Sequence, residues 1–152
     1  MNVIYEYDKD TRKASCIIED KNIIGVGNAA CHPTDEDIAS ERTGLCIAED
    51  RAKIHFLQNK KEAKLKPALA ALNHLYATMS HSKQFNEHSY EAKRIRKEIK
   101  NLQKEINQAN CSIELIRARL KDYIDTKDKM ARMYRVKNKI KENTEKNGTE
   151  NV

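Results

Sequence analysis

An unbroken 3-4 repeat of apolar residues in the C-terminal third constrains this chain more than any other feature. With Ala92 as position a, every a and d position through Tyr123 is apolar, and the register passes Lys127 to resume at Met130 and Tyr134. A repeat kept over more than four heptads is typical of a coiled-coil seam. The seam positions are Ala92, Ile95, Ile99, Leu102, Ile106, Ala109, Ile113, Ile116, Leu120 and Tyr123. We therefore expect a long helix over 89–140 that packs on the helices of 35–79 or on another chain.

The N-terminal 30 residues have a different period. Three β-rich segments at 3–7, 14–19 and 22–27 predict short strands, and Asp20-Lys21 suits a tight hairpin turn between the second and third. Three strands make a small antiparallel sheet with a face that helices or a second copy must cover.

Between sheet and seam, residues 34–80 have a helical apolar period. Thr34 or Asp35 suits the N-cap, and the acidic cluster at 35–37 would then lie at the positive end of the helix dipole. Pro67 should kink this segment or start a second helix, because proline lacks an N–H and clashes with the preceding turn.

The fold class expected is α+β: a small sheet followed by long helices in a coiled-coil-like bundle, completed by oligomerisation. The chain reads as one domain over 1–142, with the sheet in 1–30 and the helices in 34–80 and 89–140; residues 143–152 are expected to be a disordered tail. Charged residues make up 34% and aromatics 5%, which favours an elongated molecule or a core shared between subunits. No apolar run is long enough for a membrane span and no signal peptide is visible, so a soluble, intracellular protein is expected.

Residues 25–50 look most like a site, but their spacings fit no familiar template. Gly25 and Gly27 lack the third glycine or the Lys-Ser/Thr of a phosphate loop, and they are better placed to let a helix lie close to one face of a strand. The possible metal ligands Cys31, His32, Cys46 and His55 lack the paired spacing of a zinc site, and no catalytic motif is present. We expect no metal, no cofactor and no enzyme, and we expect the four cysteines to be small buried apolar residues.

The positive charge is concentrated in the C-terminal half, where residues 90–141 carry 16 Lys and Arg against 7 Asp and Glu. Such a segment attracts phosphates, nucleotides or nucleic acid, although charges that merely flank a coiled-coil seam would give the same count. Ser89 can cap the long helix and leave backbone N–H groups for an anion, with Arg94 and Arg96 on the first turns. Phe85 and Tyr90 could stack on a base.

Three blocks, "VIYEYDKDTRKASC", "GVGNAACHPTDEDIASERTGLCIAEDRAK" and "ALAALNHLYATMSHSKQFNEHSYEAKR", together resemble the phage anti-Thoeris sponge proteins of the first described type. The resemblance covers nearly the whole ordered chain. It implies a non-enzymatic protein that sequesters, unhydrolysed, the glycocyclic ADP-ribose signal of a bacterial TIR-domain immune protein in the host cytoplasm. It also implies pockets between two protomers, assembly as a homodimer or hexamer, and in some members separate sites for cyclic di- or trinucleotides.

The family pocket uses arginines, an aromatic and an asparagine from the helical part of the chain. Combined with the anion-binding pattern, this gives six ligand-binding candidates by residue type: Phe85, Asn86, Tyr90, Arg94, Arg117 and Arg119. Two other classes stay open, namely a basic coiled-coil module that binds nucleic acid or protein, and a purely structural oligomerisation module. Steep salt dependence would mark nucleic-acid binding.

Overall fold

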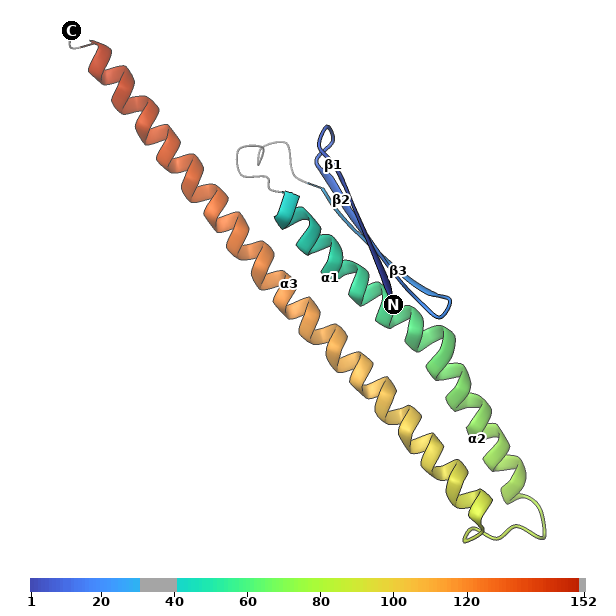
Figure 1. The fold of residues 1–152 in the computed structure, drawn as a ribbon. Coiled ribbons are helices and arrows are strands. Elements are labelled where there is room, and N and C mark those ends of the chain that lie inside the picture. The colour runs from blue at the N-terminus through green and yellow to red at the C-terminus, as the bar shows by residue number, and fades with distance from the viewer. Residues whose placement is uncertain (31–40, 151–152) are drawn as a thin grey trace.

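The computed structural model describes residues 1–30 and 41–150 of the 152-residue chain. The molecule is elongated and has three layers: the sheet, a rod formed by α1 and α2, and the long helix α3, which runs antiparallel to that rod (Figure 1). The expected α+β class, a small antiparallel sheet followed by long helices, is confirmed.

The sheet has strands β1 (Asn2–Asp8), β2 (Lys13–Asp20) and β3 (Ile23–Ala30) in the order β1-β2-β3, all antiparallel. The predicted turn at Asp20-Lys21 is wrong by one residue, because Asp20 pairs with Ile23 and the loop is Lys21-Asn22. Both loop residues have positive φ, 46° and 68°. Two successive positive φ values are those of a type I′ turn, whose twist matches that of the strands.

Helix α1 (Glu41–Lys60) covers β3 and part of β2. Ala48 and Ala52 are fully buried on this face. A Cβ on Gly27 would fall on the Ala48 carbonyl oxygen and the Ala52 nitrogen, and one on Gly25 would fall on the Ala52 carbonyl oxygen. The two glycines therefore let the helix backbone lie directly on the strand, as predicted.

A second face of α1 binds the outer edge of β3. Arg51 Nη1 donates to the Asn28 carbonyl at 2.6 Å, and Asn59 Nδ2 donates to the Ile24 carbonyl at 2.7 Å. Between them, the Val26 N–H donates to His55 Nδ1 at 2.9 Å. The three helix residues follow one another at i+4 steps, so they form a line along the strand edge, which we call the α1 row (Arg51, His55, Asn59).

One wide turn joins the two helices of the rod. Residues Lys61–Leu65 form the π-helical turn η2, and α2 (Lys66–Ser80) follows with Pro67 in its first turn. Pro67 has no N–H to donate and its ring would clash with the carbonyl four residues back, so the wider turn accommodates it. The rod thus continues past the proline, and the second helix α2 begins there, which is one of the two predicted alternatives.

Helix α3 (Tyr90–Glu150) lies along the rod with its predicted seam inward. All ten seam residues from Ala92 to Tyr123 are buried or partly buried. The partner is therefore the chain's own α1 and α2, the first of the two alternatives. Beyond Tyr123 the prediction is wrong: Met130 is exposed and Ala131 is buried instead, since the seam continues through Ile124 and Lys127.

The C-terminal end also differs from expectation. Residues 143–150, predicted to be disordered, continue α3 to Glu150. The segment is rich in Lys and Glu, which have good helix propensity. The Thr144 hydroxyl is satisfied locally by donating to the Ile140 carbonyl at 2.9 Å.

The cysteines were expected to be buried, and this holds for Cys16 alone among those described. Cys46 and Cys111 are exposed: Cys46 lies beside Tyr5 where α1 leaves β1 uncovered, and Cys111 lies on an open face of α3. The predicted cap at Thr34 or Asp35, the acidic cluster at 35–37, and the metal candidates Cys31 and His32 lie outside the described residues.

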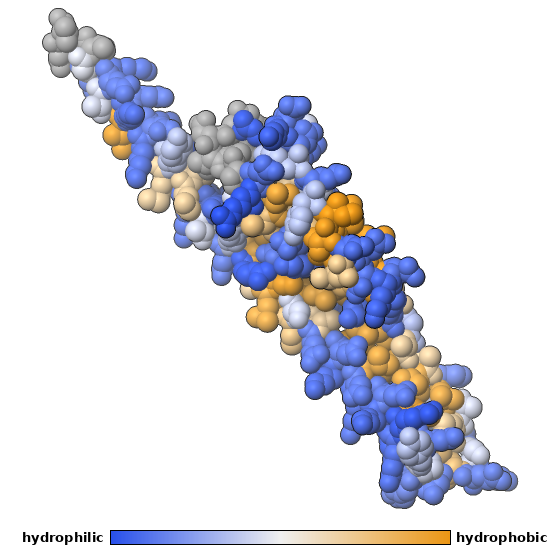
Figure 2. Space-filling view, viewed as in Figure 1, coloured by the Kyte–Doolittle hydropathy of each residue, from blue (hydrophilic) through white to orange (hydrophobic). Residues whose placement is uncertain are grey.

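Apolar residues gather over the sheet and along α2, and the C-terminal part of α3 is mostly hydrophilic (Figure 2). In the described part of the chain, no helix combines the length and apolar character that crossing a bilayer requires.

Candidate functional site

The connection between α2 and α3, residues 81–89, is built from local hydrogen bonds. The Ala92 N–H donates to Ser89 Oγ at 3.2 Å, so Ser89 caps α3 as predicted. Asn86 holds the preceding turn: its side-chain Oδ1 accepts from the His88 N–H at 2.9 Å and its carbonyl accepts from the Ser89 N–H at 3.0 Å. Asn86, one of the six candidates, thus already has a structural role.

An arginine and two aromatic rings join this loop to the helices. The rings of Tyr76 and Phe85 meet edge to face with centroids 5.9 Å apart. The Arg96 guanidinium carbon lies 5.9 Å from the Tyr76 centroid, and its nitrogens donate to Tyr76 Oη at 3.0 Å and to the Glu87 carbonyl at 2.6 Å. Arg96 and Phe85 therefore hold the loop in place, which leaves little of either for stacking on a ligand.

Tyr90 and Arg94, on the first turns of α3, are differently placed. Tyr90 is 80% exposed, and Arg94 Nε lies 3.9 Å from Glu98 on the same helix. The two candidates lie four residues apart and so share one helix face. Of the candidates near the loop, these two remain accessible to a ligand.

Arg117 and Arg119 lie farther along α3 and point in different directions. Arg117 Nη1 contacts Glu114 on its own helix at 3.1 Å, and its side chain is 50% exposed. Arg119 Nη2 reaches across to Asp50 of α1 at 2.7 Å, where the Asp50 side chain is only 17% exposed. Residues two apart on a helix do not face each other. One ligand on one chain would therefore meet only one of the two guanidinium groups.

The six candidates form two groups rather than one pocket. Arg94 and Arg117 are 23 residues apart, which corresponds to roughly 35 Å along a straight helix at 1.5 Å per residue. The structure thus brings Tyr90 and Arg94 together at the loop end and leaves Arg117 and Arg119 in the middle of α3, beside α1.

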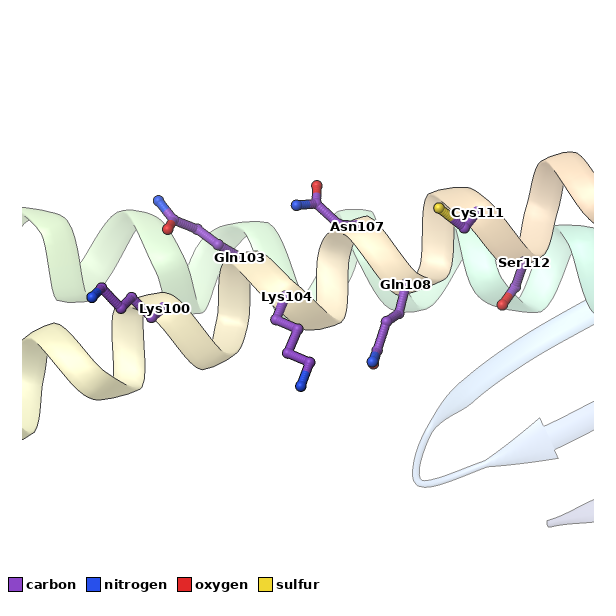
Figure 3. Close-up of a pocket in the computed structure, with 7 residues that line it drawn as sticks. All are labelled: Lys100, Gln103, Lys104, Asn107, Gln108, Cys111 and Ser112. Carbon is purple, nitrogen blue, oxygen red and sulfur yellow. The ribbon is translucent and has the colours of Figure 1, made fainter.

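Two open hollows mark the surface. The larger, about 730 Å³, is lined only by α3, and its side chains leave the helix on both sides instead of converging (Figure 3). Its lining residues are Lys100, Gln103, Lys104, Asn107, Gln108, Cys111 and Ser112. It is a polar, basic helix face, so it offers a broad contact surface and not an enclosed cavity.

The smaller hollow, about 520 Å³, lies between β1 and the start of α1 and was not suggested by the sequence. It exists because α1 lies over β3 and β2 and leaves the same face of β1 largely uncovered. Tyr5, Arg42, Leu45 and Glu49 are among its lining residues. Desolvation, followed by the nearby Glu49 carboxylate, raises the pKa of Tyr5 above its usual value.

Across residues 1–30 and 41–150, no three His, Cys, Asp or Glu side chains gather closely enough to hold a metal ion. His55 belongs to the α1 row, and burial raises the pKa of the Cys16 thiol, which keeps it in the unreactive protonated form.

Comparison with known proteins gives no relative: no family model, curated protein or solved structure matches the chain.

Proposed function

We propose that this chain is a sponge that binds a cyclic ADP-ribose isomer, of the glycocyclic kind made by a bacterial TIR-domain immune protein, and holds it without hydrolysis in the cytoplasm of the infected cell. The resemblance to the anti-Thoeris sponges motivates the ligand. The structural observation that carries the proposal is Arg117, a half-exposed guanidinium group on a rigid helix whose described partner is an exposed carboxylate of the same helix.

An arginine in that position is ready for a phosphate ligand. An exposed ion pair contributes only about 0–1 kcal/mol, so Arg117 can exchange Glu114 for a pyrophosphate at little cost. The guanidinium group then offers a planar, two-pronged donor to phosphate oxygens. Arg119 is less available to a ligand, because moving its guanidinium group away would leave the largely buried Asp50 carboxylate without its ion-pair partner.

A site that used both groups would have to be shared between chains. A ligand that contacts both Arg117 and the Tyr90-Arg94 pair must take them from two copies arranged antiparallel, since they lie roughly 35 Å apart in one copy. A homodimer or a hexamer would meet this condition. Nanomolar affinity corresponds to about 12 kcal/mol, a magnitude that arginine pairs and base stacking at an interface reach together.

Isothermal titration calorimetry with purified cyclic ADP-ribose isomers tests the proposal. We expect micromolar or tighter binding of one isomer, intact ligand recovered after heat denaturation, and at least a tenfold loss of affinity in Arg117→Ala, equivalent to about 1.4 kcal/mol. Lys139→Ala, which removes the same charge from the exposed end of α3, is the matched control and should bind normally. No binding of any isomer would end the proposal, and a hydrolysed product would indicate an enzyme.

Arg119 needs a stability control in the same experiment. Arg119→Ala should lower the free energy of unfolding by about 1 kcal/mol because Asp50 loses its partner, and Asp50→Asn in the same background should recover part of that loss. An affinity change in Arg119→Ala is assigned to ligand contact only if the double variant shows it too. Cyclic di- and trinucleotides titrated with and without the ADP-ribose isomer test for a separate second site.

The basic face of α3 favours one other function, binding of nucleic acid. Lys100 and Lys104 lie there among glutamine and asparagine side chains, which are ordinary partners of phosphates and base edges. Binding of this kind would weaken steeply with salt and would not be displaced by small nucleotides. A gel shift at two salt concentrations with Lys100→Ala/Lys104→Ala separates it from the sponge. A structural oligomerisation module would bind neither ligand.

A further inference from the structure

Side chains of α1 bind one edge of the sheet, whereas the described residues leave the other edge open. On β3 the α1 row binds the carbonyls of Asn28 and Ile24 and the N–H of Val26, so this edge cannot pair with another strand. On β1, within the described residues, the backbone pairs only with β2. An open edge presents a row of free N–H and C=O groups to a further strand.

Strand β1 carries two carboxylates, Glu6 and Asp8, but it lacks the other features that usually prevent such pairing. It is seven residues long, contains no proline or lysine, and its register with β2 runs without a bulge from Asn2↔Glu19 to Asp8↔Lys13. A row of apolar residues on the sheet face away from α1 ends at this edge. Ile4 pairs with Ile17 and Ile17 with Val26, and all three side chains are more than a third exposed.

We propose that β1 pairs antiparallel with β1 of a second copy of this chain, about a two-fold axis at Ile4, to give a continuous six-stranded sheet. An axis at Ile4 fixes the register of the two strands: residues lie opposite each other when their numbers sum to eight. Ile4 meets the partner's Ile4, and Asn2 meets the partner's Glu6, where the amide can donate to the carboxylate.

Self-complementarity identifies a second copy as the occupant of this edge. The apolar row doubles in length and runs unbroken across the axis, while Val3 meets the partner's Tyr5 on the other face. An axis at Tyr5 would instead place Ile4 against the partner's Glu6 and Asn2 against the partner's Asp8, so it fits less well. The interface uses no residue of α3 and is independent of the nucleotide site proposed above.

Sedimentation equilibrium of the full chain, without ligand, tests the interface. Whether or not α3 also joins copies at the nucleotide site, Ile4→Lys should raise the dissociation constant of the β1 interface at least tenfold, because two like charges then face each other at the axis. At micromolar concentration its mass should therefore fall to half that of the native protein. Ile24→Lys is the matched control: Ile24 is 48% exposed against 51% for Ile4 and lies on the same face, but on β3. It should keep the native mass, and circular dichroism should show both variants folded.

Cross-linking tests the register, in a background where Cys31, Cys46 and Cys111 are serine. Ile4→Cys should form a disulfide between copies, since directly opposed residues have Cα atoms about 4.5–5.5 Å apart. Glu6→Cys should not, because the two copies of residue 6 would lie roughly 14 Å apart at about 3.4 Å per residue. A native chain that stays monomeric at about 200 micromolar would overturn the inference, and so would an Ile4→Lys variant that keeps the native mass. Equal cross-linking at both positions would do the same.

Discussion

Replacing Gly27 with alanine probes the contact that sets the distance between sheet and helix. The new Cβ would overlap the Ala48 carbonyl oxygen and the Ala52 nitrogen and would lie 2.9 Å from the Arg51 carbonyl carbon. All three are backbone atoms of α1, so no side-chain rotation can relieve the overlap. The helix has to move away from β3 to make room.

Whether Gly27→Ala raises or lowers the stability of the chain distinguishes this tightly packed glycine from a glycine in an uncrowded strand. No described glycine has a positive φ, so the Gly27 backbone accepts alanine, and without the helix the change would stabilise by about 0.4–1 kcal/mol through the unfolded state. Overpacking costs about 1–3 kcal/mol, and lifting α1 also stretches the three hydrogen bonds of the α1 row, worth about 1 kcal/mol each. We expect a net loss of about 3 kcal/mol and a Tm lower by roughly 6–12 °C.

Urea unfolding followed by circular dichroism measures this loss. Gly148→Ala is the control, since Gly148 is a helical glycine of α3 with no atom within 4 Å of the added Cβ. It should gain up to about 1 kcal/mol from helix propensity. If Gly27→Ala proves as stable as the native chain or more so, α1 does not rest on β3 as described.

Three further predictions concern single residues. Lys21→Asn should stabilise the chain by about 0.5–1 kcal/mol in the same unfolding assay, because Lys21 holds a φ of 46° that asparagine tolerates better; a loss would refute the strained turn. A thiol reagent should modify Cys46 within minutes and Cys16 only after unfolding, as peptide mapping would reveal; equal rates would contradict the burial that raises the pKa of Cys16. The pKa of Asp8 is lowered, first by a hydrogen bond from the Thr11 side chain and then by backbone N–H groups. Because the folded pKa is lowered, the stability that Asp8 contributes is present above the unfolded pKa of about 3.9 and disappears as pH falls through the folded pKa. The difference in unfolding free energy between the native chain and Asp8→Ala should therefore shrink from pH 5 to pH 2.5.

The parts of the fold that depend on periodicity could be predicted from the sequence. The seam from Ala92 to Tyr123 and the close approach at Gly25 and Gly27 follow from spacing alone, because few arrangements satisfy a 3-4 apolar repeat or two glycines on one strand face. The same reasoning failed beyond Tyr123, where the repeat predicts Met130 in the seam but the smaller Ala131 is buried instead.

The polar contacts could not be predicted in this way. Arg51, His55 and Asn59 have the spacing of a solvent-exposed helix face, and only the packing of α1 beside β3 turns them toward a strand edge. The candidate site had the same difficulty. Residue type selected Phe85 and Arg117 alike, but the fold makes one a loop anchor and leaves the other on the surface.

The length of α3 affects how the molecule moves in solution. Its 61 residues extend over roughly 90 Å at 1.5 Å per residue, and a thin rod of that length has a radius of gyration of about 26 Å. A compact protein of this size would have a radius of gyration of about 15 Å. Even a single copy will therefore tumble anisotropically and elute from gel filtration well ahead of its mass. Only a shape-independent measurement, such as light scattering or sedimentation equilibrium, can count the copies.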